Sequence, residues 1–316
     1  MRQTECGTTV ENTFFAEQLR QYGPKSSEHQ QSLESCQAYC RWFAKQQYEN
    51  FTVVSFLLPR RIRQDFYNIY AYCRWSDDLA DEIDGQQASL ELLKWWRGEL
   101  SMCYCSRPSH PIMLALQSTI REHNLPECHF SDLISAFEQD QRIRRYDTTT
   151  QLMDYCERSA NPVGRILLRL GNCDSAENIK ASDSICTGLQ IANFCQDMAR
   201  DARINRIYAP KDLLEKHQVT ESELLAANVT QPLREFLCEW VTQTKEYFHN
   251  GWQLVSNVPG WLATDVDLFV RGGLATLALI EKQGFDVWTD RPKLSKTHKL
   301  KLMAQSLATR FTRRAP

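Results

Sequence analysis

Two groups of polar residues have the spacing and the atoms needed to bind a metal ion. Asp77 and Asp81 form the first group, and Asn193, Asp197 and Asp201 form the second, more than a hundred residues later. Members of each group are four residues apart, which on a helix stacks their side chains on one face about 5–6 Å apart. Carboxylates at this spacing repel one another, and a hard divalent cation would relieve the repulsion. For the first group alone, an ordinary solvated acidic face is the alternative interpretation.

The second group lies in apolar surroundings. Its neighbours along the chain are Leu189, Ile191, Ala192, Phe194 and Met198. A stripe of oxygen ligands on a helix with core-like neighbours is not a solvated face, and burying it without a cation or a base is costly. The alternative here is a structural network of polar side chains.

Together the two groups make a stronger case for one site. Two helices that each carry carboxylates at this spacing can face each other inside a bundle and hold metal ions between them. Magnesium keeps several waters and prefers one or two carboxylates plus substrate phosphates. We therefore expect Mg²⁺ as the cofactor, and a diphosphate as the ligand that it bridges to the protein.

Basic residues stand beside both groups. Arg74 precedes the first group by one helical turn, and Arg206 and Tyr208 follow the second. Arginine suits bidentate contact with phosphate oxygens. Each arginine alone is more simply explained as a surface charge, and its position beside an acidic group makes diphosphate binding an equally good explanation.

Helical periodicity runs through the sequence and places both groups on helices. Because no period-two alternation and no internal repeat interrupts it, we predict an all-α protein with a flexible segment over residues 1–30 and one domain over residues 31–316. The predicted helices span residues 32–47, 62–82, 88–104, 111–123, 131–143, 175–201, 233–255, 263–282 and 295–310. A further helix begins near Thr149 and is interrupted at Asn161-Pro162, because proline cannot continue the hydrogen-bond ladder.

Composition argues against several classes of function. The net charge of −2 provides no overall attraction to nucleic acid. The N-terminus is polar and no run is apolar enough for a membrane span, so we expect a cytoplasmic protein with peripheral membrane contact at most. The 12 cysteines lack repeated CxxC pairs and are interpreted as buried thiols. Nucleotide-binding glycine loops, HExxH and GxSxG motifs are absent from the sequence.

Longer stretches around both groups resemble the signatures of the squalene and phytoene synthases. The first stretch consists of Leu57-Leu58-Pro59, Tyr70-Ala71-Tyr72-Cys73-Arg74 and Asp77-Asp78-x-x-Asp81. The second consists of Leu189-Gln190-x-x-Asn193-x-x-x-Asp197-x-x-x-Asp201 and Arg206-Ile207-Tyr208-x-Pro210. Their order and separation agree with that family, and the resemblance covers most of the chain, from about residue 35 to about residue 310.

The resemblance implies an isoprenoid synthase fold, a single helical bundle around a central cavity with acidic motifs on opposite walls. Such enzymes condense two prenyl diphosphates head to head through a cyclopropyl diphosphate. The family's metal and diphosphate positions correspond to Asp77, Asp81, Asn193, Asp197 and Asp201. Its substrate-side positions correspond to Tyr70, which is also a catalytic candidate, and to Arg74, Gln190, Arg206 and Tyr208. Arg291 matches a late basic position that closes over diphosphate.

Three stretches resemble one bacterial branch, the hydroxysqualene synthases called HpnC. They are Gln47-Tyr48-Glu49-Asn50-Phe51, Ala136-Phe137-x-Gln139-Asp140-Gln141 and the run from Tyr155 through Glu157 to Gly164. This resemblance implies conversion of presqualene diphosphate and water to hydroxysqualene and diphosphate in hopanoid biosynthesis. Glu49, Asn50 or Glu157 would position the water, with Asn50 on the substrate side and Glu157 as a catalytic residue. Structural hydrogen bonding is the alternative for all three.

Two other functions stay open. The first is a condensing enzyme that makes presqualene diphosphate or squalene from farnesyl diphosphate. The second is a non-catalytic relative that serves in protein assembly, although the intact acidic groups argue against it. Neither the oligomeric state, monomer or dimer, nor a need for reductant follows from the sequence.

Aromatic residues have two interpretations. A carbocation needs ring faces around it, and Phe51, Phe137 and Phe194 are candidates for that role as well as for plain core packing. Trp95, Trp96, Trp252 and Trp261 are candidates for membrane contact, although buried packing is the simpler interpretation.

Overall fold

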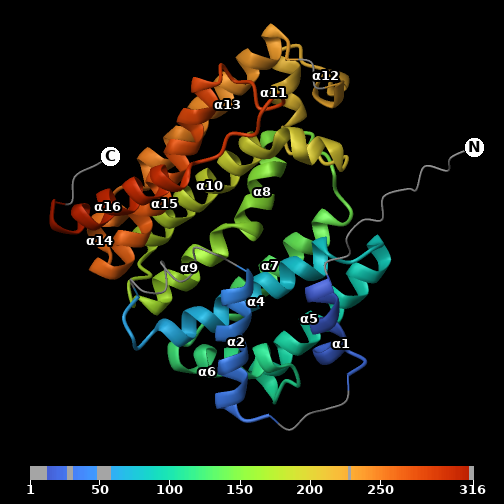
Figure 1. Ribbon diagram of the computed structural model, residues 1–316, viewed down its shortest axis with the longest axis vertical. Helices are drawn as coiled ribbons and strands as arrows, with labels where there is room; N and C mark the ends of the chain where they lie inside the picture. Colours follow the sequence, from blue (N-terminus) through green and yellow to red (C-terminus); the bar gives the residue numbers. More distant parts are fainter. Residues whose placement is uncertain (1–12, 27–30, 48–57, 227–228, 313–316) are drawn as a thin grey trace, which may run out of the picture. The chain divides into compact units, whose positions relative to one another are not determined.

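The computed structural model describes residues 13–26, 31–47, 58–226 and 229–312, and these residues form α-helices and no strand (Figure 1). One isolated bridge joins Arg145 and Ile207. Two compact units divide the chain: one draws on residues 1–51 and 64–127, the other on residues 52–63 and 128–316. The prediction of an all-α protein is confirmed.

The helices of the first unit are α1 (Thr13–Tyr22), α2 (Leu33–Gln47), α4 (Arg63–Asp81), α5 (Gln86–Cys105) and α6 (Pro111–His123). Those of the second unit are α7 (Glu127–Asp140), α8 (Thr149–Ser159), α9 (Asn161–Leu170), α10 (Ala176–Arg203), α11 (Lys211–Lys216), α12 (Glu221–Ala226), α13 (Gln231–Gly251), α14 (Leu254–Asn257), α15 (Gly260–Lys282) and α16 (Lys296–Thr312).

A buried cluster of aromatic side chains forms the core of the first unit. Trp75 and Trp96 are fully buried and stack with ring centroids 5.9 Å apart, while His110 contacts both rings edge-on. Trp96 Nε1 donates a hydrogen bond to Ser76 Oγ (2.7 Å), which ties α5 to α4. Because Trp75 and Ser76 occupy the inner face of α4, the first acidic group lies on the less buried side of that helix.

The second unit is organised around α10, which packs against α9, α13 and α15. The apolar neighbours predicted to surround the second acidic group are mostly buried: Ile191, Ala192, Phe194 and Met198. Asn193, by contrast, is exposed. The helix therefore has a packed apolar face and a polar stripe along another face, as expected for residues at three- and four-residue spacing.

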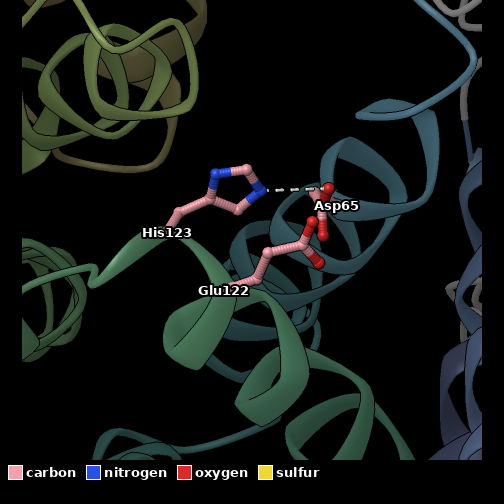
Figure 2. Close-up of side chains that lie close together, drawn as sticks. All are labelled: Asp65, Glu122 and His123. Carbon is pink, nitrogen blue, oxygen red and sulfur yellow. Dashed lines mark hydrogen bonds and ion pairs between the residues drawn. The ribbon is translucent and has the colours of Figure 1, made fainter.

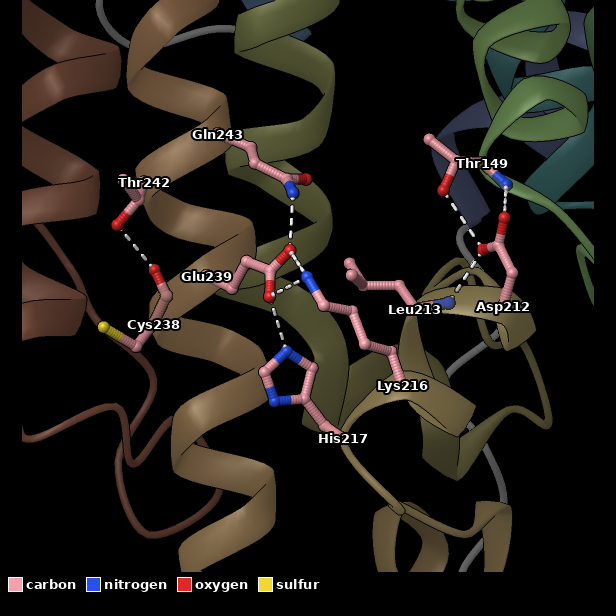
Figure 3. A network of polar contacts seen from close by, with 9 residues as sticks. All are labelled: Thr149, Asp212, Leu213, Lys216, His217, Cys238, Glu239, Thr242 and Gln243. Atoms are coloured by element: carbon pink, nitrogen blue, oxygen red, sulfur yellow. Dashed lines mark hydrogen bonds and ion pairs between the residues drawn. The ribbon is translucent and has the colours of Figure 1, made fainter.

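Contacts to two other helices hold the segment that follows α10 (Figure 3). Asp212 on α11 accepts hydrogen bonds from the backbone N–H (2.9 Å) and the hydroxyl (3.1 Å) of Thr149 at the start of α8. Lys216 and His217 contact the carboxylate of Glu239 on α13, at 2.6 Å and 2.7 Å. These contacts anchor α11 and so restrain the loop that carries two predicted substrate-side residues.

Most of the predicted helices are confirmed, with ends that differ by a few residues. The interruption at Asn161-Pro162 is also confirmed, since α8 ends at Ser159 and α9 begins at Asn161. The helix predicted over residues 233–255 is wrong near its end, because α13 ends at Gly251 and the short helix α14 follows. The helices α11 and α12 have 6 residues each, too few for a periodic pattern to reveal them.

The N-terminal prediction requires a correction. Residues 13–22 belong to the segment expected to be flexible, yet they form α1. Phe15 is buried, with its ring centroid 5.2 Å from that of Trp75, and Phe14 contacts Trp42 on α2. Burial of Phe15, together with partial burial of Phe14, offsets the loss of chain entropy on ordering the helix. The remaining domain boundaries stay a prediction.

The described cysteines are free thiols, and burial is confirmed for five of them: Cys36, Cys40, Cys103, Cys156 and Cys195. It is wrong for Cys105, Cys128 and Cys238, which are exposed. Trp96 and Trp261 are buried, as the simpler interpretation predicts. Within the described residues, no helix combines the length and the mean hydropathy required to span a membrane.

Candidate functional site

The first acidic group lies at the end of α4 and is paired with an arginine of the same helix. Arg74 Nη1 lies 3.1 Å from Asp77 Oδ2, and its Nη2 forms a second ion pair with Asp78. Asp78 is fully buried, and burial raises the pKa of its carboxyl group to about 7 against the opposing effect of Arg74. Asp81, the last residue of α4, is exposed.

Helical spacing alone brings these residues together. Tyr70 lies one turn before Arg74, so the predicted substrate-side and metal-binding residues follow one another along α4. Sequence reasoning did not assign a role to Asp78. The structure makes Asp78 the buried partner that orients the Arg74 guanidinium.

The second acidic group follows the polar stripe of α10. Asp197 is partly buried, with 20% of its side chain exposed, and Asp201 lies one turn later. Burial, reinforced by repulsion from Asp197, raises the pKa of Asp201 to about 7. Gln190 and Asn193 precede these carboxylates on the same helix. A cation beside this pair would favour the ionised form of both aspartates.

Arg291 reaches the second acidic group from the segment between α15 and α16. Its Nε pairs with Asp197 Oδ1, and its Nη2 donates to Asp197 Oδ2 at 3.0 Å. The side-chain amide of Gln196 donates to the carbonyl of Pro292, which holds the same segment against α10. The late basic position predicted from the sequence therefore lies directly on a predicted metal ligand.

A buried cluster of rings surrounds Asp140, a residue with no predicted site role. The hydroxyls of Tyr155 and Tyr208 both donate to its carboxylate, at 2.6 Å and 3.2 Å. The ring of Phe194 stacks on Tyr208 with centroids 4.0 Å apart, and Tyr146 lies 5.9 Å from Tyr208. The only signal available beforehand was the position of Asp140 within the stretch that resembles hydroxysqualene synthases.

A small pocket connects this ring cluster with the second acidic group. Its walls include Asp201, Arg206 and Tyr208, three predicted site residues, together with Phe194 and Met198. Repulsion from Asp140 adds to the rise in the pKa of Asp201, whereas Arg200 and Arg206 oppose it. The second unit thus combines a carboxylate, a guanidinium and aromatic faces at the C-terminal end of α10.

Glu157, a predicted catalytic residue, lies apart from the ring cluster. Glu157 has 62% of its side chain exposed and lies 3.5 Å from Arg165, which also pairs with Asp183 on α10. Its contacts do not join the ring cluster, which α8 reaches through Tyr155. Asn50 is outside the described residues, as are Glu49 and Phe51.

The chain matches the family model for squalene/phytoene synthase over residues 44–298. It is 35% identical over 201 residues to hydroxysqualene synthase from Zymomonas mobilis subsp. mobilis, a match that covers 62% of this chain and 66% of that protein, just under two thirds. It is 27% identical over 251 residues to presqualene diphosphate synthase from Rhodopseudomonas palustris, covering 79% of this chain and 89% of that one.

A solved structure of a similar protein has the same fold as this chain. The crystal structure of squalene synthase HpnC from Alicyclobacillus acidocaldarius matches with a TM-score of 0.77 and 39% identity, covering 80% of this chain and 96% of that chain. The chain belongs to the squalene/phytoene synthase family. The predicted isoprenoid synthase fold is therefore confirmed.

The acidic groups of this family member suit a hard cation. Asp197 and Asp201 provide carboxylate oxygens and Asn193 provides an amide oxygen, with no thiol or imidazole in the set. Oxygen-only ligands favour Mg²⁺ over softer metals. Burial, reinforced by repulsion from Asp197, raises the pKa of Asp201, and a bound cation would oppose both effects by stabilising the ionised carboxylate.

A second cluster of potential metal ligands lies in the first unit and contains none of the residues that match the two family signatures. Asp65 on α4 lies close to Glu122 and His123 on α6 (Figure 2). Asp65 accepts a hydrogen bond from Thr119 Oγ1 (2.8 Å) and pairs with His123 Nε2 (3.2 Å). These bonds satisfy the buried carboxylate, so we interpret the cluster as a polar contact that packs α4 against α6.

Proposed function

We propose that this protein is a hydroxysqualene synthase that acts on presqualene diphosphate. The carbon–oxygen bond to diphosphate breaks, the cyclopropylcarbinyl cation rearranges, and water adds to carbon and loses a proton. The products are hydroxysqualene, diphosphate and one proton. The observation that carries this choice of reaction is the 35% identity to a hydroxysqualene synthase over 201 residues. The pocket in which Asp201, Arg206 and the ring of Tyr208 lie together supports the first step, because departure of diphosphate needs positive charge and the remaining cation needs ring faces.

The acidic groups would hold Mg²⁺. We assign this role to Asp77 and Asp81 on α4 and to Asn193, Asp197 and Asp201 on α10. When bound, the metal would supply Lewis-acid stabilisation of the leaving diphosphate. The oxygen-only ligand set and the raised pKa of Asp201 support this assignment.

Arginines would bind the diphosphate, since guanidinium groups match its oxygens bidentately. Arg206 lines the pocket beside Asp201, and Arg291 already lies within hydrogen-bond distance of Asp197. We assign Arg74 the same role for the first group, where two aspartates orient it. Tyr70, one turn before Arg74, and Gln190, one turn before Asn193, complete the proposed substrate side.

We propose Asp140 as the group that accepts the proton from water. It is buried, accepts hydrogen bonds from Tyr155 and Tyr208, and lies beside the ring stack that would face the cation. Glu157 stays a candidate for the same role, but its exposed position and its contact with Arg165 favour Asp140.

The decisive experiment supplies each substrate separately. Purified protein with Mg²⁺ is incubated either with presqualene diphosphate or with farnesyl diphosphate, in water enriched in ¹⁸O. We expect hydroxysqualene with one labelled oxygen from presqualene diphosphate alone. Turnover of farnesyl diphosphate with presqualene diphosphate left unchanged would contradict the proposal.

Presqualene diphosphate synthase is the second candidate, in which two farnesyl diphosphates condense. It is favoured by the relative from Rhodopseudomonas palustris, whose match covers 89% of that protein. The same incubation distinguishes the two, because the condensing enzyme releases diphosphate from farnesyl diphosphate and incorporates no label.

A further inference from the structure

The outer face of α16 carries exposed leucines. Leu300 and Leu307 are 61% and 36% exposed, although both belong to a helix that packs against α15. They are two turns apart and therefore share one face. Leu302, only 8% exposed, and the fully buried Ser306 belong to the inner face of the same helix. The helix, which is labelled in Figure 1, thus has a buried side that includes Leu302 and a separate exposed stripe formed by Leu300 and Leu307.

Lysines flank the outer stripe. Lys299 and Lys301 come directly before and after Leu300, so each lies about 100° around the helix from it, on opposite sides. Lys296 lies one turn before Leu300. All three lysines are exposed. Long lysine stems can lie along an apolar surface while their ammonium groups extend beyond it.

The surrounding sequence is strongly basic, although the whole protein has a net charge of −2. From residue 293 to the end of the sequence there is no aspartate or glutamate. The same stretch contains seven basic residues: Lys293, Lys296, Lys299, Lys301, Arg310, Arg313 and Arg314. Among the described residues, no lysine of α16 forms an ion pair with an acidic side chain.

We propose that the outer face of α16 docks the protein onto a bilayer rich in anionic phospholipid. Exposed leucines with lysines on both sides are the pattern of a helix that lies in the membrane interface, with leucines among the acyl chains and lysines at the phosphates. A soluble phosphate ligand would use the lysines but would leave the leucines exposed. The inner face of α16 stays packed on α15, so the helix lies along the surface and does not cross it.

Vesicle sedimentation tests the proposal. The full protein is mixed with vesicles of phosphatidylcholine alone or of equal parts phosphatidylcholine and phosphatidylglycerol. We expect binding to the anionic vesicles only, with loss at high salt. Lys299→Gln/Lys301→Gln should weaken binding by about 30-fold, since each basic residue near an anionic surface contributes about fivefold. Leu300→Ser/Leu307→Ser should weaken it even at low salt.

Two matched control variants remove exposed lysines or exposed leucines from helices other than α16. Lys45→Gln/Lys94→Gln removes two exposed lysines from α2 and α5, and Leu33→Ser/Leu225→Ser removes two leucines that are each 48% exposed. Both should bind vesicles like the wild type. Turnover of detergent-dispersed presqualene diphosphate, or of farnesyl diphosphate if that is the substrate, should be unchanged in the α16 variants. Membrane docking therefore does not depend on which reaction is correct.

Three results would overturn the proposal. The first is no binding to anionic vesicles, and the second is equal binding by the α16 variants and the controls. The third is evidence that a second copy of the chain, and not a membrane, binds the outer face of α16. In that case the wild type would sediment as a dimer without lipid, Leu300→Ser/Leu307→Ser would make it monomeric, and vesicle binding would not change.

Discussion

On α10, two aspartates form similar ion pairs in different surroundings. Asp183 pairs with Arg165 and Asp197 pairs with Arg291, and their side chains are 21% and 20% exposed. Only Asp197 has a second carboxylate one turn away, in Asp201. An ion pair of this exposure contributes little to stability. The neighbouring carboxylate, and not the ion pair itself, therefore distinguishes the proposed metal ligand from a structural residue.

We predict that Asp77→Ala and Asp197→Ala each reduce kcat/KM by at least ~100-fold, because electrostatic stabilisation of the leaving diphosphate is lost. The fold should be retained, since both side chains are partly exposed. Steady-state kinetics and circular dichroism check this result. Asp183→Ala is the matched control and should keep turnover near the wild-type level. A similar loss in the control, or near-normal turnover in Asp197→Ala, would refute the assignment.

The two candidates for proton acceptance can be separated by conservative changes. Tyr155 and Tyr208 donate to different oxygens of Asp140, so Asp140→Asn keeps an acceptor for one of them and loses the basic carboxylate. We predict a drop of about 100-fold in hydroxysqualene formation, within the usual range for a general base. Glu157→Gln should stay within about threefold of the wild type, because this side chain contacts Arg165 at the surface. Product analysis that shows the reverse order would assign the role to Glu157.

At the scale of elements, α15 illustrates how close packing depends on single positions. It carries the adjacent residues Gly272 and Gly273. A Cβ atom at Gly273 would lie 2.3 Å from the ring of Phe248 on α13, which is fully buried. A Cβ atom at Gly272 would meet nothing within 4 Å. The contact between α13 and α15 therefore requires glycine at position 273 but not at position 272.

We predict opposite effects of the same substitution at these positions. Gly273→Ala should lower the free energy of unfolding by about 1–3 kcal/mol, because the Phe248 ring cannot move within a packed core. Gly272→Ala should raise it by up to about 1 kcal/mol, since alanine restricts the unfolded chain and favours helix. Denaturant unfolding measures both values. Equal effects would contradict the packing described for α13 and α15.

At the scale of the whole molecule, stability should depend on pH through a buried histidine. His110 lies among Trp75 and Trp96, is 1% exposed, and burial lowers its pKa well below the ordinary value. The unfolded chain therefore binds a proton below about pH 6.5 that the folded chain does not bind. Folding stability falls as pH decreases through that value.

We predict a loss of up to about 1.4 kcal/mol per pH unit below about pH 6.5 from this residue. His110→Asn removes the titrating group but can still cap α6, where His110 Nδ1 accepts from the N–H of Ile112. The difference in unfolding free energy between wild type and variant should therefore shrink as pH falls from 7 to 5. A constant difference over that range would show that His110 does not account for the pH dependence.

Much of the fold could be predicted because helical periodicity is a local property. Residues three and four apart share a face regardless of what packs against it, so the helices carrying Asp77, Asp81, Asn193, Asp197 and Asp201 follow from spacing alone. The resemblance to squalene and phytoene synthases rests on the same local stretches. By contrast, burial of α1 required aromatic partners on α2 and α4, and α11 and α12 are too short for spacing to reveal them.

Only the tertiary structure decided which side chains that are distant in the sequence contact one another. Arg291 lies 94 residues from Asp197, and Tyr208 lies 68 residues from Asp140, yet each pair is joined by hydrogen bonds. Glu157 is only two residues from the buried Tyr155 but lies on the exposed side of α8. The sequence alone determined most of the helices and the oxygen-bearing side chains that they carry. Partners across the fold depend on how helices pack, and no local pattern encodes that packing.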